Sequence, residues 1–454
     1  MPFDGTATAA SITMPLPTIP PAAFPLPAPA ARPPSERHRP VSATLAANEA
    51  LAARRRQGLA VLPLAFGEAG LPAHPALCDA LAAATASNRY GPVAGHQALR
   101  SAAAGYWRRR GLAASADSIV CGPGSKPLLF GLLLAVGGDV AVPRPSWVSY
   151  AAQASLIGVR PHFVPAAPGE GGICDPEALG AAVLAARAAG REIRSVVVTL
   201  PDNPTGRLPR PATVKAFCAV AAELDLIIIS DEIYRDLVHD PATPVLSPAA
   251  VAPERTVVTT ALSKSFALGG WRLGAARMPD GPLGQWLRSQ LLGIGSEIWS
   301  APAAPIQQAA AVAFKESEEI AVRVSRSRSL HAAVSRAVAG TCAAAGLDVP
   351  PPQAAFYVYP DFEPWRAHLA RRHGVTTGAA LAGLLLERYG AGTLPGSAFG
   401  ESKQALRLRL ATGSLYGDTE ARQEEALAAP DPLALPWIAA HIARLQEILA
   451  GLSP

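Results

Sequence analysis

The chain is poor in the residues that build disulfide frameworks and metal sites. Its 454 residues include only five cysteines, an odd number, and no two of them form a CxxC pair. This pattern argues against a disulfide scaffold or a structural zinc site, and it favours a reducing compartment such as the cytoplasm. The nine histidines show no HExxH or other ligand spacing, so we expect no metal.

Long hydrophobic runs and large charge imbalances are also missing. The longest strongly apolar run, residues 128–136, is too short to cross a bilayer, and we expect no membrane contact. The amino terminus has no charged segment followed by an apolar segment and a cleavage site, which predicts no export signal. The net charge of +5 is modest, and the basic clusters at residues 54–56 and 108–110 lack interleaved aromatics. We therefore expect solvated helix faces there and no nucleic-acid partner.

Residues 1–40 are rich in proline and alanine. Prolines recur between positions 15 and 34, where they remove the backbone donors that helices and sheets need. This composition predicts a disordered or extended arm, and the alternative is a segment that clasps a partner subunit. A chain of this length is expected to build more than one core. We predict the N-terminal part of a small domain at 41–74, a large cofactor-binding domain at 75–305, and an interdomain helix with the rest of the small domain at 306–454.

Beyond residue 75, alanine-rich helical stretches alternate with short apolar runs. Such runs are typical of buried parallel strands, and we expect strands at 139–143, 195–200, 226–230 and 256–262. The pattern predicts a three-layer α/β/α domain with a mostly parallel sheet, which binds its ligand at the carboxyl ends of the strands. After Pro305 the sequence predicts one long helix over 306–345 and a strand at 355–359. These segments would belong to a smaller α+β domain built from the N- and C-terminal parts of the chain.

Polar groups follow these expected strands in an order that suits an aldehyde cofactor. Such a cofactor needs a lysine amine, an acid against its ring nitrogen, donors to its ring oxygen and a cradle for its phosphate. Lys264 offers the amine, Asp231 the acid, and Asn203 and Tyr234 the donors. Taken singly, a surface lysine, a capping aspartate and a plain Asn-Pro turn are the ordinary alternatives. The combination is what indicates pyridoxal phosphate.

A phosphate cradle is expected where Cys121-Gly122-Pro123-Gly124-Ser125-Lys126 precedes an apolar helix. A glycine-bearing turn at a helix amino terminus presents free backbone donors, although most such turns bind nothing. Ser125 and Lys126 are the candidate ligands in this turn. Arg272 would add a permanent positive charge, and Ser263 a hydroxyl.

In this order the motifs resemble those of the class I and II aminotransferases, in the aspartate aminotransferase superfamily of fold type I pyridoxal-phosphate enzymes. The resemblance covers about residues 64 to 413. It implies that Lys264 holds the cofactor as a Schiff base and carries the proton of a 1,3 shift. It also implies that Trp147 stacks on the cofactor ring. Tyr90 would reach the phosphate of the neighbouring subunit, which predicts a homodimer with shared active sites.

The resemblance extends to the substrate side. Arg407, in Leu406-Arg407-Leu408-Arg409-Leu410-Ala411, matches the arginine that holds the substrate's α-carboxylate, and Arg409 is expected on a solvated face. Gly67 fits a backbone contact to the substrate, to which Asn203 would also contribute. One position departs from the pattern, because Ala261 stands where many relatives carry a phosphate-binding serine.

The leading hypothesis is therefore an aminotransferase that moves an amino group between an amino acid and a 2-oxo acid. A lyase or synthase performing elimination, replacement or cyclisation on the same fold shares these motifs and stays open as an alternative. A regulator with an aminotransferase-like sensor domain is a third hypothesis. Such regulators place a winged helix ahead of that domain, and residues 1–40 are too short and too rich in proline for one.

Overall fold

The structure, a computed structural model, describes residues 42–454. The expected Pro/Ala-rich arm at residues 1–40 lies outside the described residues. Residues 42–454 belong to one compact unit. Within the described part of the chain, no helix is both long enough and apolar enough to cross a membrane.

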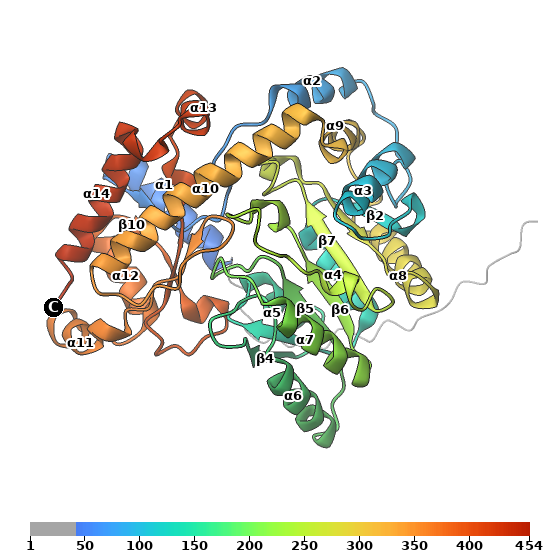
Figure 1. Ribbon diagram of the computed structural model, residues 1–454, viewed down its shortest axis with the longest axis horizontal. Helices are drawn as coiled ribbons and strands as arrows, with labels where there is room; N and C mark the ends of the chain where they lie inside the picture. The colour runs from blue at the N-terminus through green and yellow to red at the C-terminus, as the bar shows by residue number, and fades with distance from the viewer. Residues whose placement is uncertain (1–41) are drawn as a thin grey trace, which may run out of the picture. The chain divides into compact units, whose positions relative to one another are not determined.

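A seven-stranded sheet forms the centre of the larger part of this unit (Figure 1). Its strand order is β2-β8-β7-β6-β5-β3-β4, and only β8 runs antiparallel to its neighbours. The strands are β2 (Ile119–Gly122), β3 (Asp139–Arg144), β4 (Pro161–Pro165), β5 (Ile193–Thr199), β6 (Ile227–Asp231), β7 (Thr256–Ala261) and β8 (Gly274–Arg277). The predicted mostly parallel sheet is confirmed, and the four expected strands are β3, β5, β6 and β7.

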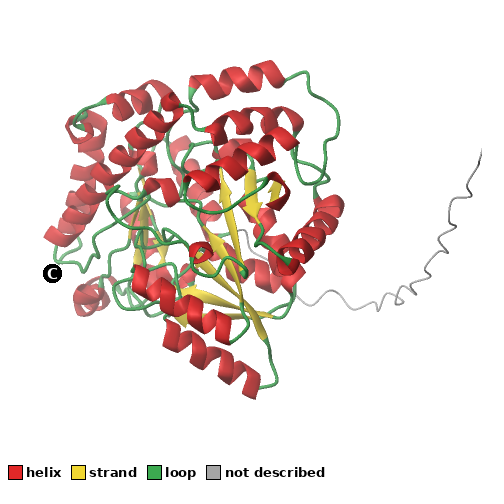
Figure 2. Ribbon diagram, turned by 45° about the vertical axis from the view of Figure 1, so that its right-hand side comes forward, coloured by secondary structure: helices red, strands yellow, loops and turns green. Residues whose placement is uncertain are grey.

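Helices cover both faces of the sheet, with the strands between them (Figure 2). Successive side chains of a strand point to opposite faces, so Val197 of β5 packs on one side while Val196 and Val198 pack on the other. The first face is covered by α4 (Ser125–Val136), α5 (Val148–Leu156) and α8 (Pro282–Ile298). The opposite face is covered by α3 (Gln97–Arg109), α6 (Pro176–Ala188), α7 (Pro211–Glu223) and α9 (Ala304–Lys315). These layers form the expected three-layer α/β/α arrangement.

A second hydrophobic cluster brings the segment around β1 (Leu62–Pro63) together with the C-terminal part of the chain. It packs Leu62 and Leu64 against buried residues between Leu330 and Leu452. Here β11 (Leu394–Pro395), β12 (Leu408–Ala411) and β9 (Tyr357–Val358) form a small antiparallel sheet, while β1 pairs with β10 (Ala391–Gly392). The helices of this part are α1 (Ala43–Arg56), α10 (Glu318–Ala344), α11 (Arg366–His373), α12 (Gly378–Tyr389), α13 (Glu420–Ala428) and α14 (Pro436–Ala450). This part has the expected α+β character, and the boundaries at residues 74 and 305 stay predictions.

The single helix expected over 306–345 is wrong, because the chain turns between α9 and α10. Glu316 adopts the left-handed conformation, with φ of 54°, which is uncommon for residues other than glycine. Its carboxylate is held by Arg109 at 2.7 Å and by Arg110 at 2.5 Å. Since α9 packs against α2 (Pro75–Ala84) and α3, the turn leaves α9 with the large sheet and lets α10 reach the smaller part. The strand expected at 355–359 is shortened to β9.

Candidate active site

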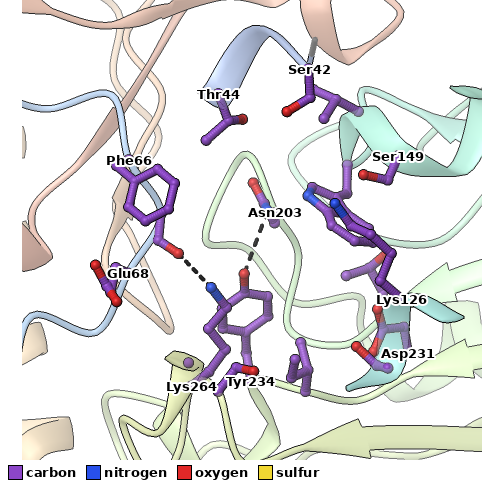
Figure 3. A pocket seen from close by; sticks show the side chains of 18 of the residues that line it. Ser42, Thr44, Phe66, Glu68, Lys126, Ser149, Asn203, Asp231, Tyr234 and Lys264 are labelled. Carbon is purple, nitrogen blue, oxygen red and sulfur yellow. Dashed lines mark hydrogen bonds between the residues drawn. The ribbon is translucent and has the colours of Figure 1, made fainter. Parts of the chain in front are cut away.

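A cavity of about 420 Å³ lies at the carboxyl ends of the central strands and gathers most of the predicted site residues (Figure 3). Asn203 follows β5, Asp231 ends β6, and Lys264 follows β7, so three neighbouring strands deliver them to one edge of the sheet. The predicted residues that line the cavity are Gly67, Ser125, Lys126, Trp147, Asn203, Asp231, Tyr234, Ser263, Lys264 and Arg272.

Lys264 extends into the cavity from the turn after β7. Its Nζ donates a hydrogen bond to the carbonyl oxygen of Gly67, from the segment that leads out of β1. Burial of the amine lowers the pKa of Lys264 to about 8, and the positive charges of Arg409 and Arg272 act in the same direction. The negative charges of Glu68 and Asp231 oppose this shift. About one tenth of the amine is therefore uncharged at pH 7, far more than for an ordinary lysine, and the uncharged form is the one that acts as a nucleophile.

Asp231 presents a buried carboxylate, only 3% exposed, at the end of β6. Its Oδ2 accepts a hydrogen bond from the Tyr150 hydroxyl at 3.0 Å, and its Oδ1 accepts one from the Thr259 hydroxyl at 3.2 Å. Burial raises the pKa of Asp231 to about 6, although these two donors lower it. Around neutral pH the group is mostly ionised and suits a partner that carries a positively charged N–H.

Asn203 and Tyr234 approach each other in the same cavity as Lys264. Asn203 Nδ2 lies 3.5 Å from the Tyr234 hydroxyl, and Asn203 Oδ1 accepts a hydrogen bond from Arg409 Nη1 at 3.3 Å. The Tyr234 hydroxyl also lies 2.7 Å from that of Tyr357. Burial raises the pKa of Tyr234 well above its ordinary value, so the phenol keeps its proton and acts as a hydrogen-bond donor.

The amino terminus of α4 and Arg272 form an anion-binding corner. Gly124 precedes α4 with φ of 92°, and a side chain at this position would collide with the guanidinium of Arg272. The absent side chain thus lets a permanent positive charge approach the free N–H groups of the first helical turn. Arg272 Nη1 is fixed by the Gly269 carbonyl at 2.8 Å and lies 3.4 Å from the Ser263 hydroxyl. The buried Ala261 at the end of β7 contributes no hydroxyl to this corner.

Lys126 brings a further cation to the cavity. Its Nζ lies 5.1 Å from the centre of the Trp147 ring, within the range of a cation–π contact. Burial, aided by the charge of Arg272, lowers the pKa of Lys126. The Trp147 ring meets the Tyr150 ring edge to face, with centres 5.3 Å apart. Tyr150 in turn donates its hydroxyl hydrogen to Asp231.

Arg409 of β12 and Arg407, which comes just before this strand, are placed opposite to expectation. Arg409, expected on a solvated face, is 1% exposed and lines the cavity, where its guanidinium lies 5.0 Å from the Tyr357 ring. The Arg407 side chain is 45% exposed, lies outside the cavity and pairs with two carboxylates, Asp361 at 2.8 Å and Glu401 at 2.7 Å. The expectation for Arg407 is therefore corrected. Its charge is already neutralised, whereas within residues 42–454 no carboxylate pairs with Arg409.

Tyr90 does not line this cavity and is 93% exposed. Its predicted contact with a neighbouring subunit stays a prediction.

Several residues that sequence reasoning missed support the site. Tyr150 lies three positions after Trp147, a spacing that puts both side chains on one side of the start of α5, and this spacing is the signal that could have identified it. Tyr357 and Arg409 come from the small sheet, far along the chain, and carry no local signal of this role. Ser42 and Thr44, at the start of α1, also line the cavity.

Comparisons with known proteins follow the same geometry. The family described as "Aminotransferase class I and II" matches residues 61–423. Aspartate/prephenate aminotransferase of Thermus thermophilus is 31% identical over 329 residues, covering 71% of this chain and 82% of that protein. Aspartate aminotransferase of Pinus pinaster is 30% identical over 374 residues, covering 79% of this chain and 73% of that protein.

Solved structures show the same fold. Aspartate aminotransferase from Thermus thermophilus with maleate matches with a TM-score of 0.76 and 27% identity, covering 90% of this chain and 97% of that one. An aminotransferase from Mycobacterium tuberculosis matches in fold, with a TM-score of 0.76 at 23% identity, over 92% of this chain and 99% of that one. The family match spans the cavity residues from Phe66 to Arg409.

Proposed function

Because the chain belongs to the class I and II aminotransferases, a family that uses pyridoxal phosphate, we propose that its cavity binds this cofactor and that its amino donor is a dicarboxylic amino acid. As an aminotransferase it acts on amino acid and 2-oxo acid substrates. The observation that carries the proposal is that Lys264, Asp231, the Gly124–Arg272 corner and Arg409 meet in one cavity, and that Arg409 pairs with no carboxylate of the described residues.

The residues present fit each part of pyridoxal phosphate. The phosphate suits the amino terminus of α4, where Gly124 makes room for Arg272 and where Ser125 and Ser263 add hydroxyls. The ring nitrogen suits the carboxylate of Asp231, and the face of the ring suits Trp147. When bound, the cofactor supplies an aldehyde for the amino group and a ring that withdraws electrons from the substrate's α-carbon.

Lys264 is the proposed base and nucleophile. Since its pKa is about 8, its amine exists in both protonation states near neutral pH. A group poised in this way can accept a proton at Nζ and give it back within one turnover. The bond from Nζ to the Gly67 carbonyl fixes where the amine rests.

Asp231, Asn203 and Tyr234 are proposed to tune the cofactor ring. The Asp231 carboxylate would hold a proton on the ring nitrogen, and the donors from Tyr150 and Thr259 keep that carboxylate ionised despite its burial. Asn203 and Tyr234 would donate to the ring oxygen, which favours its anionic form.

Arg409 is proposed to bind the α-carboxylate of the substrate, the role that the sequence suggested for Arg407. Its guanidinium is held by the Ala65 carbonyl and Asn203, while its buried Nε has no partner in the described residues. A planar guanidinium that lacks a carboxylate partner suits two parallel hydrogen bonds to a carboxylate.

Lys126 is proposed to bind the second carboxylate of a dicarboxylic substrate. The names of relatives such as aspartate/prephenate aminotransferase refer to dicarboxylic substrates. In this chain Lys126 offers a cation in the same cavity as Arg409, anchored over Trp147. Replacing Lys126 by methionine should therefore lower kcat/KM for aspartate about tenfold or more, and for phenylalanine much less, because only aspartate loses an ion pair. An equal loss for both amino acids would contradict this assignment.

The cofactor and the reaction are tested together by spectroscopy and turnover. Purified protein should develop a visible absorption band with pyridoxal phosphate, and borohydride reduction should fix the cofactor on a peptide that contains Lys264. In a separate sample that has not been reduced, one equivalent of aspartate should convert the cofactor to its amine form and release one equivalent of 2-oxo acid. Absence of the band would refute the cofactor proposal. Product formation without conversion of the cofactor would favour the lyase or synthase alternative.

We further propose a homodimer in which Tyr90 reaches the partner's site. A tyrosine that is 93% exposed is an unusual surface feature, and burial in an interface would explain it. Light scattering should give twice the chain mass. The five cysteines, which are unpaired, support a reducing compartment such as the cytoplasm.

A further inference from the structure

Two buried phenols touch at the floor of the cavity. The hydroxyls of Tyr234 and Tyr357 lie 2.7 Å apart, and the residues are 3% and 1% exposed. The rings meet edge to face, with centres 5.5 Å apart. Tyr234 follows β6 of the large sheet, whereas Tyr357 belongs to β9 of the small sheet. Either hydroxyl can donate in this contact, and the surrounding groups decide between the two directions.

Arg409 sets the orientation of the Asn203 amide. A guanidinium only donates hydrogen bonds, so the Asn203 atom that faces Arg409 at 3.3 Å must be the oxygen. The amide nitrogen then faces Tyr234 and donates toward its oxygen at 3.5 Å. The Tyr234 oxygen is thus already an acceptor. A phenol oxygen has one hydrogen and two acceptor positions, which leaves one acceptor position for Tyr357.

The hydroxyl of Tyr357 has one partner in the described residues, namely Tyr234. A side chain at Gly67 would lie 2.5 Å from this hydroxyl, so the glycine lets Tyr357 sit against the backbone that receives Lys264. If Tyr234 donated to Tyr357, the hydrogen of Tyr357 would have no acceptor and Tyr234 would have no hydrogen left for the cavity. If Tyr357 donates, the hydrogen of Tyr234 stays available.

We propose that Tyr357 is a positioning residue for the reaction: it donates to Tyr234, and the Tyr234 hydrogen is thereby reserved for the ring oxygen of the cofactor. This rests on the proposed function, in which Tyr234 donates to that oxygen. A hydroxyl that itself accepts hydrogen bonds is a stronger donor, because the bonds polarise one another. Tyr357 therefore strengthens the effect of Tyr234 without touching the cofactor.

The test replaces Tyr357 by phenylalanine, which removes only the hydroxyl. The readout is the pH at which the visible absorption of the enzyme with bound pyridoxal phosphate changes. A weaker donor to the ring oxygen disfavours its anionic form, so this spectroscopic pKa should rise by about 0.4 to 1 unit. The wild-type titration is the reference, and its visible band tests cofactor binding separately.

A matched control removes a buried hydroxyl elsewhere. Tyr416 is 0% exposed, and its hydroxyl lies 2.7 Å from Nδ1 of His331, away from the cavity lining. Tyr416→Phe should lower stability comparably and leave the spectroscopic pKa unchanged. Tyr234→Phe should raise this pKa, and adding Tyr357→Phe to it should have no further effect, since Tyr357 acts only through Tyr234.

An unchanged spectroscopic pKa in a folded Tyr357→Phe protein that binds pyridoxal phosphate would overturn the proposal. So would a further rise when Tyr357→Phe is added to Tyr234→Phe. Should Tyr357→Phe not fold, Gly67→Ala offers a second perturbation, because its methyl group would displace the Tyr357 hydroxyl. It should raise the spectroscopic pKa in the same way, and no rise would again count against the proposal. A wild type without a visible band would refute the proposed function instead.

Discussion

The assignment of the substrate's α-carboxylate to Arg409, and not to Arg407, gives the most specific prediction. Replacing Arg409 by lysine removes the planar pair of donors but keeps the positive charge in the buried site. Hydrogen bonds between charged groups contribute about 1.5 to 3 kcal/mol each, so a bidentate contact contributes about 3 to 6 kcal/mol. Because the lysine ammonium keeps part of this interaction, the loss should be about 3 to 4 kcal/mol. That corresponds to a fall in kcat/KM of about two to three orders of magnitude for every amino donor, because each carries the α-carboxylate.

Arg407 provides the matched control, because it lies two positions before Arg409 in the same extended segment. Its side chain is 45% exposed and already pairs with Asp361 and Glu401. Replacing Arg407 by lysine should change kcat/KM only a few-fold. Its cost in stability should be below about 1 kcal/mol, because water screens a half-exposed pair.

The assay measures kcat/KM with aspartate and with a monocarboxylic amino acid for both variants. It also measures the rise in melting temperature caused by maleate, a dicarboxylate. Arg409→Lys should lose most of that rise, while Arg407→Lys should keep it. A large loss in Arg407→Lys together with near-normal activity in Arg409→Lys would refute the assignment of Arg409 and restore the expectation from the sequence.

Three further predictions concern the anion-binding corner at the start of α4 and the turn that contains Asp202. Gly124→Ala should weaken pyridoxal phosphate binding about tenfold or more, as measured by equilibrium titration, because the methyl group would displace Arg272; unchanged affinity would contradict the anion corner. Ala261→Ser should tighten binding a few-fold by adding a hydroxyl near the phosphate, whereas weaker binding would show that the hydroxyl is not accommodated. Burial raises the pKa of Asp202 from 3.8 to about 7, so the native state holds this proton more tightly, and its stabilisation is lost as pH rises through about 7. Asp202→Asn replaces the carboxyl group by an amide that does not titrate. It should remove a pH dependence on the order of 4 kcal/mol from the free energy of unfolding between about pH 4 and 8, measured by denaturant titration. Identical pH profiles of wild type and variant would refute the raised pKa of Asp202.

Much of the fold and of the candidate site could be predicted because the signals are local. The apolar runs that became β3, β5, β6 and β7 are each continuous along the chain, and both faces of the sheet are buried. Polar residues directly after such runs lie at the carboxyl edge of a parallel sheet. This reasoning predicted that Asn203, Asp231 and Lys264 lie close together, and all three line one cavity.

The break between α9 and α10 had no such signal. Glutamate is a good helix former, and the sequence around Glu316 reads as continuous helix. The left-handed turn is held by Arg109 and Arg110 at the end of α3, about two hundred positions earlier in the chain. A conformation stabilised by such distant partners is visible only in the folded molecule.

By itself, the sequence determined the α/β class, the lysine and its partners on neighbouring strand ends, because strand formation and strand-end positions follow from local patterns. The tertiary structure alone decided which arginine faces the cavity. Arg407 and Arg409 are two residues apart and share one face, so strand periodicity cannot distinguish them. Carboxylates from other segments, Asp361 and Glu401, neutralise Arg407, while Asn203 and Tyr357 place Arg409 in the cavity. The position of a charge in the fold, relative to distant partners, determines its role.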